Sequence, residues 1–87
     1  MPPMHFDDRL ATVLRLPGSG QAFARIQYRQ LVDLLGTLPG DLRSEQETAA
    51  YARLAELSRL VPADARTRAL RDPGLRLRNP RLVALLA

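Results

Sequence analysis

The chain contains no cysteine, no tryptophan and no lysine, and it has a single histidine, His5. Without cysteine it has no disulfides, no thiol chemistry and no zinc site with cysteine ligands. Without lysine, Schiff-base catalysis and the phosphate-binding lysine of a P-loop are excluded. Most metal and redox functions are therefore ruled out, and we expect a non-catalytic protein without a cofactor.

Long apolar runs are also missing. The longest uninterrupted run is Leu82–Ala87, whereas a membrane-spanning helix needs about 20 apolar residues. The segment Met1–Asp8 has neither a basic residue nor the apolar stretch of a secretory signal. We therefore expect no membrane span and a cytoplasmic location.

The composition is that of a small folded domain. The 87 residues are 46% hydrophobic and 25% charged, which is apolar enough for a core but too short for two domains. No run of β-branched residues with a period of two is present, so no strand is predicted. These features favour one all-α domain over residues 1–87.

Three stop signals divide the chain at regular intervals. Leu-Pro-Gly stands at 16–18 and at 38–40, and Val-Pro-Ala at 61–63. Proline cannot continue a helix and glycine readily adopts the left-handed conformation that ends one. Apolar residues between the stops recur at helical spacing, and Ser44 with Glu47 forms a capping-box pattern. The sequence therefore predicts an antiparallel bundle of three main helices at about 5–16, 20–37 and 44–60.

Two shorter helices are predicted beyond the third stop, at about 62–71 and 80–87. Asp72, Pro73 and Gly74 are predicted to turn the chain between them, and Asn79 followed by Pro80 predicts the start of the last helix. That helix has no polar face and no C-cap, so we expect the 87 residues to be the N-terminal part of a longer protein. Its apolar residues form the predicted protein-interaction surface, for self-association or for the rest of the chain: Leu82, Val83, Leu85 and Leu86.

Positive charge is concentrated near the C-terminus. Residues 1–65 have 7 arginines and 8 acids, a net charge of −1, and residues 66–87 have 6 arginines and one acid, a net charge of +5. Clustered arginines are typical of anion and nucleic-acid binding, but no aromatic residue lies among them to stack on bases. Nucleic-acid binding through residues 66–81 is therefore an alternative function rather than the favoured one. The candidate anion-binding residues are Arg66, Arg68, Arg71, Arg76, Arg78 and Arg81.

Few other residues are candidates for chemistry. His5 would be a phosphoacceptor if the chain were a histidine-kinase-associated helical domain, a second alternative, although its place before the first helical turn is wrong for that role. Ser19 and Ser44 are better explained as helix caps than as nucleophiles. Tyr28 and Tyr51 are predicted to pack in the core with their hydroxyls at its rim.

Several segments together resemble a known kind of sequence: Tyr28–Leu35, Leu54–Leu57, Val61–Arg66, Arg71–Pro73 and Asn79–Leu86. A Val-Pro helix start, an Asp-Pro turn and a leucine-rich helix of this type are similar to the HEAT-like repeats of alphaproteobacterial regulatory proteins, some of which accompany two-component signalling systems. The resemblance covers about two thirds of the chain and rests on aliphatic spacing. It implies HEAT-like stacking of helices and a non-catalytic interaction or regulatory module, and it transfers no functional residue.

Overall fold

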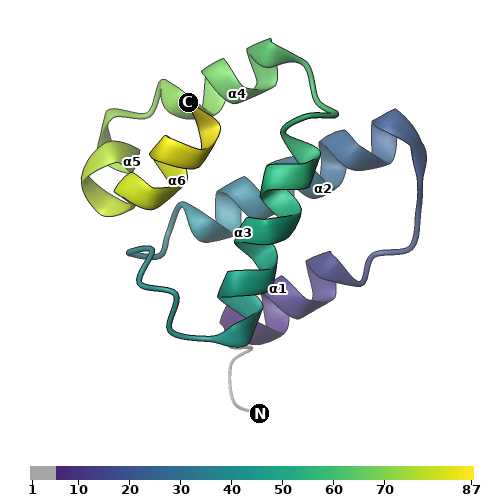
Figure 1. Ribbon diagram of the computed structural model, residues 1–87, viewed down its shortest axis with the longest axis horizontal. Helices are drawn as coiled ribbons and strands as arrows, with labels where there is room; N and C mark the ends of the chain where they lie inside the picture. Colours follow the sequence, from purple (N-terminus) through teal and green to yellow (C-terminus); the bar gives the residue numbers. More distant parts are fainter. Residues whose placement is uncertain (1–5) are drawn as a thin grey trace.

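A computed structural model describes residues 6–87 of the chain (Figure 1). This part is all-α, as the sequence predicts, and contains no strand. The helices are α1 (Phe6–Leu14), α2 (Gly20–Leu35), α3 (Glu45–Leu57), α4 (Ala63–Leu70), α5 (Pro73–Arg78) and α6 (Pro80–Leu86).

The first three helices form a bundle in which each packs against the other two. Leu10, Leu31, Leu35, Leu54 and Leu57 are completely buried at its centre, and burying a leucine contributes about 1.5–3 kcal/mol. The last three helices pack on one another and, through α6, on α3. Mutual packing of three helices is typical of a small bundle, and it gives no support to HEAT-like stacking.

Each of the three long helices ends in a tighter 3₁₀-type turn. The amides of Leu16, Leu38 and Leu60 donate to the carbonyl oxygen three residues earlier. The predicted helix ends at 16, 37 and 60 are therefore two or three residues too late. The apolar spacing does not reveal this change, because Leu16 and Leu38 still pack against the core.

The start of α3 shows the serine half of the predicted capping box, and no bond from the Ser44 amide to the Glu47 side chain is formed. The Ser44 hydroxyl accepts a hydrogen bond from the Glu47 amide at 3.1 Å. It also donates to the carboxylate of Asp7 at 2.8 Å. One short side chain therefore fixes the first turn of α3 and joins it to the first turn of α1.

Residues 72–74 do not form the predicted turn, because they begin the helix α5. The Asp72 carboxylate accepts a hydrogen bond from the Gly74 amide at 2.9 Å, and Pro73 occupies the first helical position. Asp-Pro-Gly therefore begins a helix here. Hydrogen bonds from Arg78 and from the Gly74 amide hold the pKa of Asp72 below its usual value.

Three side chains join the C-terminal helices to the end of α2 and to the loop that follows it. Asn79, completely buried, donates to the Leu35 carbonyl at 2.9 Å and caps α6 by accepting from the Leu82 amide. Arg78 donates to the Gly36 carbonyl at 2.9 Å, and Arg81 to the Gly40 carbonyl at 3.0 Å. Carbonyl groups at the end of a helix lack partners within that helix, so these bonds hold α5 and α6 in place.

Candidate binding groove between α2 and α4

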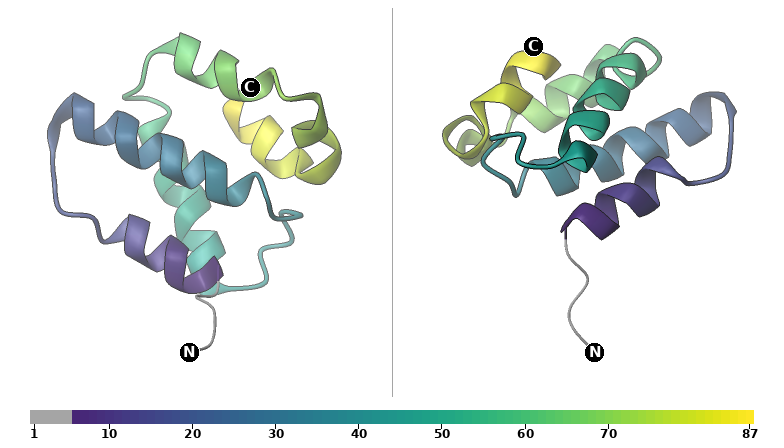
Figure 2. Two further views of the ribbon diagram at one scale, coloured as in Figure 1. Left: turned by 180° about the vertical axis from the view of Figure 1, so that it is seen from behind. Right: turned by 60° about the horizontal axis from the view of Figure 1, so that its bottom comes forward.

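One face of α2 is left open by the bundle. The helix α4 packs on α5 and α6 and not closely on α2, and a groove of about 630 Å³ lies between α2 and α4. Figure 2 (left) shows the two helices running in the same general direction, with α5 beyond their ends. The residues on the groove from α2 and its C-cap are spaced i, i+3, i+4, i+7, i+8 and i+11, and they are Arg25, Tyr28, Arg29, Val32, Asp33 and Gly36.

This spacing describes a single stripe along three turns of α2. With a rise of about 1.5 Å per residue, the stripe is about 16 Å long. The opposite wall is contributed by Ala65, Arg68 and Ala69 of α4, and Leu75 of α5 closes one end. The groove is therefore elongated, open along one side and bounded by two helices.

The walls combine apolar surface with unpaired charge. Val32, Ala65 and Ala69 are half-buried and supply apolar surface. The three ion pairs within residues 6–87 are Arg43–Asp41, Arg53–Glu56 and Arg78–Asp72. The Arg78–Asp72 pair lines the groove. The groove arginines Arg25, Arg29 and Arg68 belong to none of the three pairs, and neither do the lining carboxylates Asp33 and Asp64.

Two buried polar atoms, one on α2 and one on α4, have no hydrogen-bond partner within the described residues. They are the Tyr28 hydroxyl oxygen and the Arg66 Nε. Tyr28 is 3% exposed, and Arg66 is half-buried on α4. Burial raises the pKa of the Tyr28 hydroxyl, and the nearby positive charge of Arg66 acts in the opposite direction.

The tyrosine hydroxyls do not lie at the rim of the core, contrary to the sequence-based prediction. The Tyr51 hydroxyl is buried and accepts a hydrogen bond from Asn79 at 2.6 Å. The Tyr28 hydroxyl is buried without a partner. The prediction was wrong because the spacing of a tyrosine in a helix does not show how deep its terminal oxygen lies.

The predicted interaction surface on α6 is largely buried within the domain. Leu82 and Leu86 are buried in the core, and Val83 and Leu85 are half-buried against it. The unbroken apolar run suggested that one side of α6 would stay free for a partner, but α6 packs on α3, α4 and α5. A partner therefore cannot reach Leu82 and Leu86 while the chain keeps this fold.

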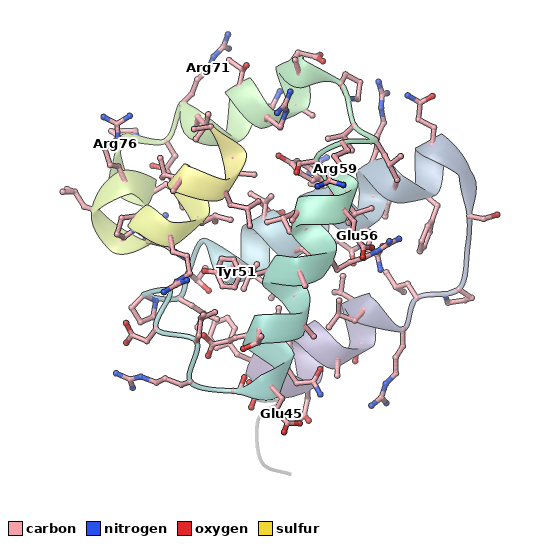
Figure 3. The ribbon with its side chains drawn as sticks, in the orientation of Figure 1. Glu45, Tyr51, Glu56, Arg59, Arg71 and Arg76 are labelled. Atoms are coloured by element: carbon pink, nitrogen blue, oxygen red, sulfur yellow. The ribbon has the colours of Figure 1, made fainter. Side chains whose placement is uncertain are left out.

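The six candidate arginines divide into two groups. Arg78 and Arg81 donate to backbone carbonyls, and Arg66 is half-buried. Arg78 and Arg81 are exposed, but these bonds hold them in place. Arg68, Arg71 and Arg76 are exposed and make no side-chain hydrogen bond or ion pair within the described residues, and Figure 3 shows the last two extending away from the chain near α4 and α5. The structure thus leaves three of the six available for an anion at the surface.

The structure adds no support for a chemical role of the other candidate residues. His5 lies outside the described residues. Ser44 is used as a cap, and Ser19 precedes α2 without a side-chain capping bond. Within residues 6–87, no group of three His, Asp or Glu side chains is placed to hold a metal ion, and no helix has the length and apolar character to cross a membrane.

Large apolar side chains are exposed only singly over the described part of the chain. These residues lie on different segments, and they are Phe6, Ile26, Leu60 and Leu77. Scattered exposed residues of this kind are ordinary at protein surfaces. The groove is therefore a better candidate for a binding site than any of these positions.

Comparisons with protein-family models, with curated proteins and with solved structures found no match. The resemblance to HEAT-like regulatory proteins therefore stays a prediction, and the groove has to be interpreted from its own residues.

Proposed function

We propose that the chain is a non-catalytic helical interaction module that binds an acidic, amphipathic helix of a partner protein in the groove between α2 and α4. The observation that carries the proposal is the open stripe along three turns of α2. The stripe of about 16 Å along α2 matches a helix of about ten residues, and helix-in-groove binding is a common form of peptide recognition.

The charges of the groove determine which kind of helix it suits. Arg25, Arg29 and Arg68 stand along its walls outside any ion pair of the described residues, and the chain as a whole has a net charge of +4. An occupant with aliphatic residues toward Val32 and Ala69 and acids toward the arginines would match both properties. A cytoplasmic location and attachment to a bacterial signalling protein belong to the same proposal, and they rest on the sequence alone.

A peptide selection tests the proposal. Helical 16-residue peptides displayed on phage are selected on the full chain, and their affinities are measured by calorimetry. Ala69→Arg should fill the groove and weaken binding at least tenfold, which corresponds to about 1.4 kcal/mol. Arg29→Glu should have a similar effect through repulsion, and because Arg29 is exposed the variant should fold normally.

The matched control is Ala49→Arg, which makes the same change at an exposed position on α3, away from the groove. It should leave the affinity unchanged, while circular dichroism checks that each variant is folded. Selected peptides that bind Ala69→Arg and Arg29→Glu as tightly as the unmodified chain would refute the proposal. So would a selection that yields no binder at all.

Arginine-mediated nucleic-acid binding remains the alternative, because Arg68, Arg71 and Arg76 are exposed. It predicts affinity for duplex DNA that falls steeply with salt. Loss of DNA binding in Arg71→Gln and Arg76→Gln, with no effect of Ala69→Arg, would favour this alternative over the groove.

A further inference from the structure

One side of α3 has no helix packed on it within the described chain. The helix packs closely on α1, α2 and α6, and Figure 1 shows it crossing in front of α1 and α2 with its outer side open. The exposed residues of this side are spaced i, i+3, i+4, i+7, i+11 and i+14, which makes one stripe about 21 Å long. They form the outer face of α3: Glu45, Thr48, Ala49, Ala52, Glu56 and Arg59.

The two ends of the outer face carry opposite charges. Glu45 is the first residue of α3, and Arg59 lies in the turn that ends the helix; Figure 3 shows them at its two ends. Within the described residues neither takes part in an ion pair, whereas Glu56 is paired with Arg53. The middle of the face is occupied by the small side chain of Ala52, which permits close approach of a second helix.

This arrangement of charges is complementary to itself. Glu45 and Arg59 each lie seven positions, or two helical turns, from Ala52. Two copies of α3 placed antiparallel with Ala52 at the centre therefore bring each Glu45 opposite Arg59 of the other copy. A parallel arrangement would place like charges opposite each other. A contact between two identical surfaces of this kind closes after two copies.

The same arrangement covers an exposed apolar side chain. Leu60, which is 56% exposed, and Ser44 each lie eight positions from Ala52, so Leu60 of one copy lies opposite Ser44 of the other. A shallow hollow of about 520 Å³ lies beside Ser44, and half-buried Leu42 contributes to its lining. Contact between Leu60 and this hollow would remove apolar surface from water.

We propose that a second copy of this chain packs antiparallel on the outer face of α3, with two Glu45–Arg59 ion pairs across the contact. This face shares no residue with the lining of the groove between α2 and α4, so the proposal is independent of the proposed function. The stripe covers roughly 200 Å² of each copy at a helix width of about 10 Å, against the roughly 800 Å² per partner of a stable interface. The dimer is therefore weak and depends on protein concentration.

Sedimentation of the full chain from about 10 μM to about 1 mM measures this association. Ala52→Arg should weaken it at least tenfold by placing two arginines at the centre of the contact. Glu45→Arg and Arg59→Glu should each do the same, because each places like charges opposite one another. The double variant Glu45→Arg/Arg59→Glu restores opposite charges and should associate as the unmodified chain does.

The double variant also separates association from folding. Both substitutions oppose the helix dipole, so thermal unfolding should show the double variant to be the least stable of these charge variants, and better folding cannot explain restored association. Ala22→Arg, at an exposed position on α2 outside both surfaces, is the matched control and should leave the association unchanged.

Ala49→Arg distinguishes the dimer contact from the groove. It should dissociate the dimer and leave peptide binding in the groove intact, since Ala49 lies on the outer face of α3 and does not line the groove. A chain that stays monomeric at every concentration would overturn the proposal. So would a dimer that is equally strong in the unmodified chain and in the two single charge variants.

Discussion

Asn79→Ala is expected to destabilise the chain by about 3 kcal/mol, since it removes a helix cap, leaves the buried Tyr51 hydroxyl without its hydrogen bond and removes one of the two bonds to the Leu35 carbonyl. Asn79 donates to the Leu35 carbonyl and to the Tyr51 hydroxyl, and it accepts from the Leu82 amide. A domain of this size has a total stability of only about 4–13 kcal/mol. The Tm should fall by about 12–24 °C, which calorimetry or circular dichroism would measure.

Asn79→Ser is the matched variant for the cap. Serine can accept from the Leu82 amide but is too short to reach Leu35 and Tyr51, so it should recover about 1 kcal/mol of the loss. Tyr51→Phe removes a single hydrogen bond of the network and should cost less than Asn79→Ala. If Asn79→Ala lowered the stability by less than 1 kcal/mol, Asn79 would not be the residue that joins the C-terminal helices to α2.

Gly40→Ala is expected to cost about 2–4 kcal/mol, from two causes that can be separated. Gly40 has a φ of 79°, a conformation that costs other residues about 1–2 kcal/mol. A Cβ atom at this position would also collide with the side-chain oxygen of buried Asn79. Denaturant unfolding would show a lower midpoint with an unchanged slope.

Gly20 supplies the control for the backbone contribution. Its φ is 87°, but a Cβ atom there meets nothing within 4 Å. Gly20→Ala should therefore show only the backbone cost, and the difference between the two variants measures the contact with Asn79. Equal effects of Gly40→Ala and Gly20→Ala would contradict the close approach of Gly40 to Asn79.

The sequence was sufficient for elements that local chemistry determines. The Leu-Pro-Gly stops, the Ser44 cap and the Asn79–Pro80 start all correspond to observed helix boundaries within a few residues. The helix α5 escaped prediction because Asp-Pro-Gly suits both a turn and a helix start. The Asp72 bond to the Gly74 amide occurs in both, and the helical backbone bond from the Asn79 amide to the Leu75 carbonyl distinguishes them.

The groove could not be predicted, because it depends on how α4 is placed relative to α2. The spacing of Arg25, Tyr28, Arg29, Val32 and Asp33 is visible in the sequence, but it is equally typical of a face covered by another helix. The long-range bonds of Arg78 and Arg81 to backbone carbonyls, which hold α5 and α6, have no local sequence pattern. For the same reason, the sequence does not show that two of the six clustered arginines, Arg78 and Arg81, are held by backbone carbonyls.

The two walls of the groove differ in how firmly they are held. α2 has five buried residues, whereas α4 has eight residues and none of them is buried. Segments with few buried contacts open locally at low free energy, so the amides of α4 should exchange with solvent well before those of α2. A ligand in the groove would therefore contact a rigid wall, α2, and a flexible wall, α4. Its binding would be coupled to the ordering of α4. Such coupling lowers the affinity for a given contact area and is suited to transient, reversible interactions.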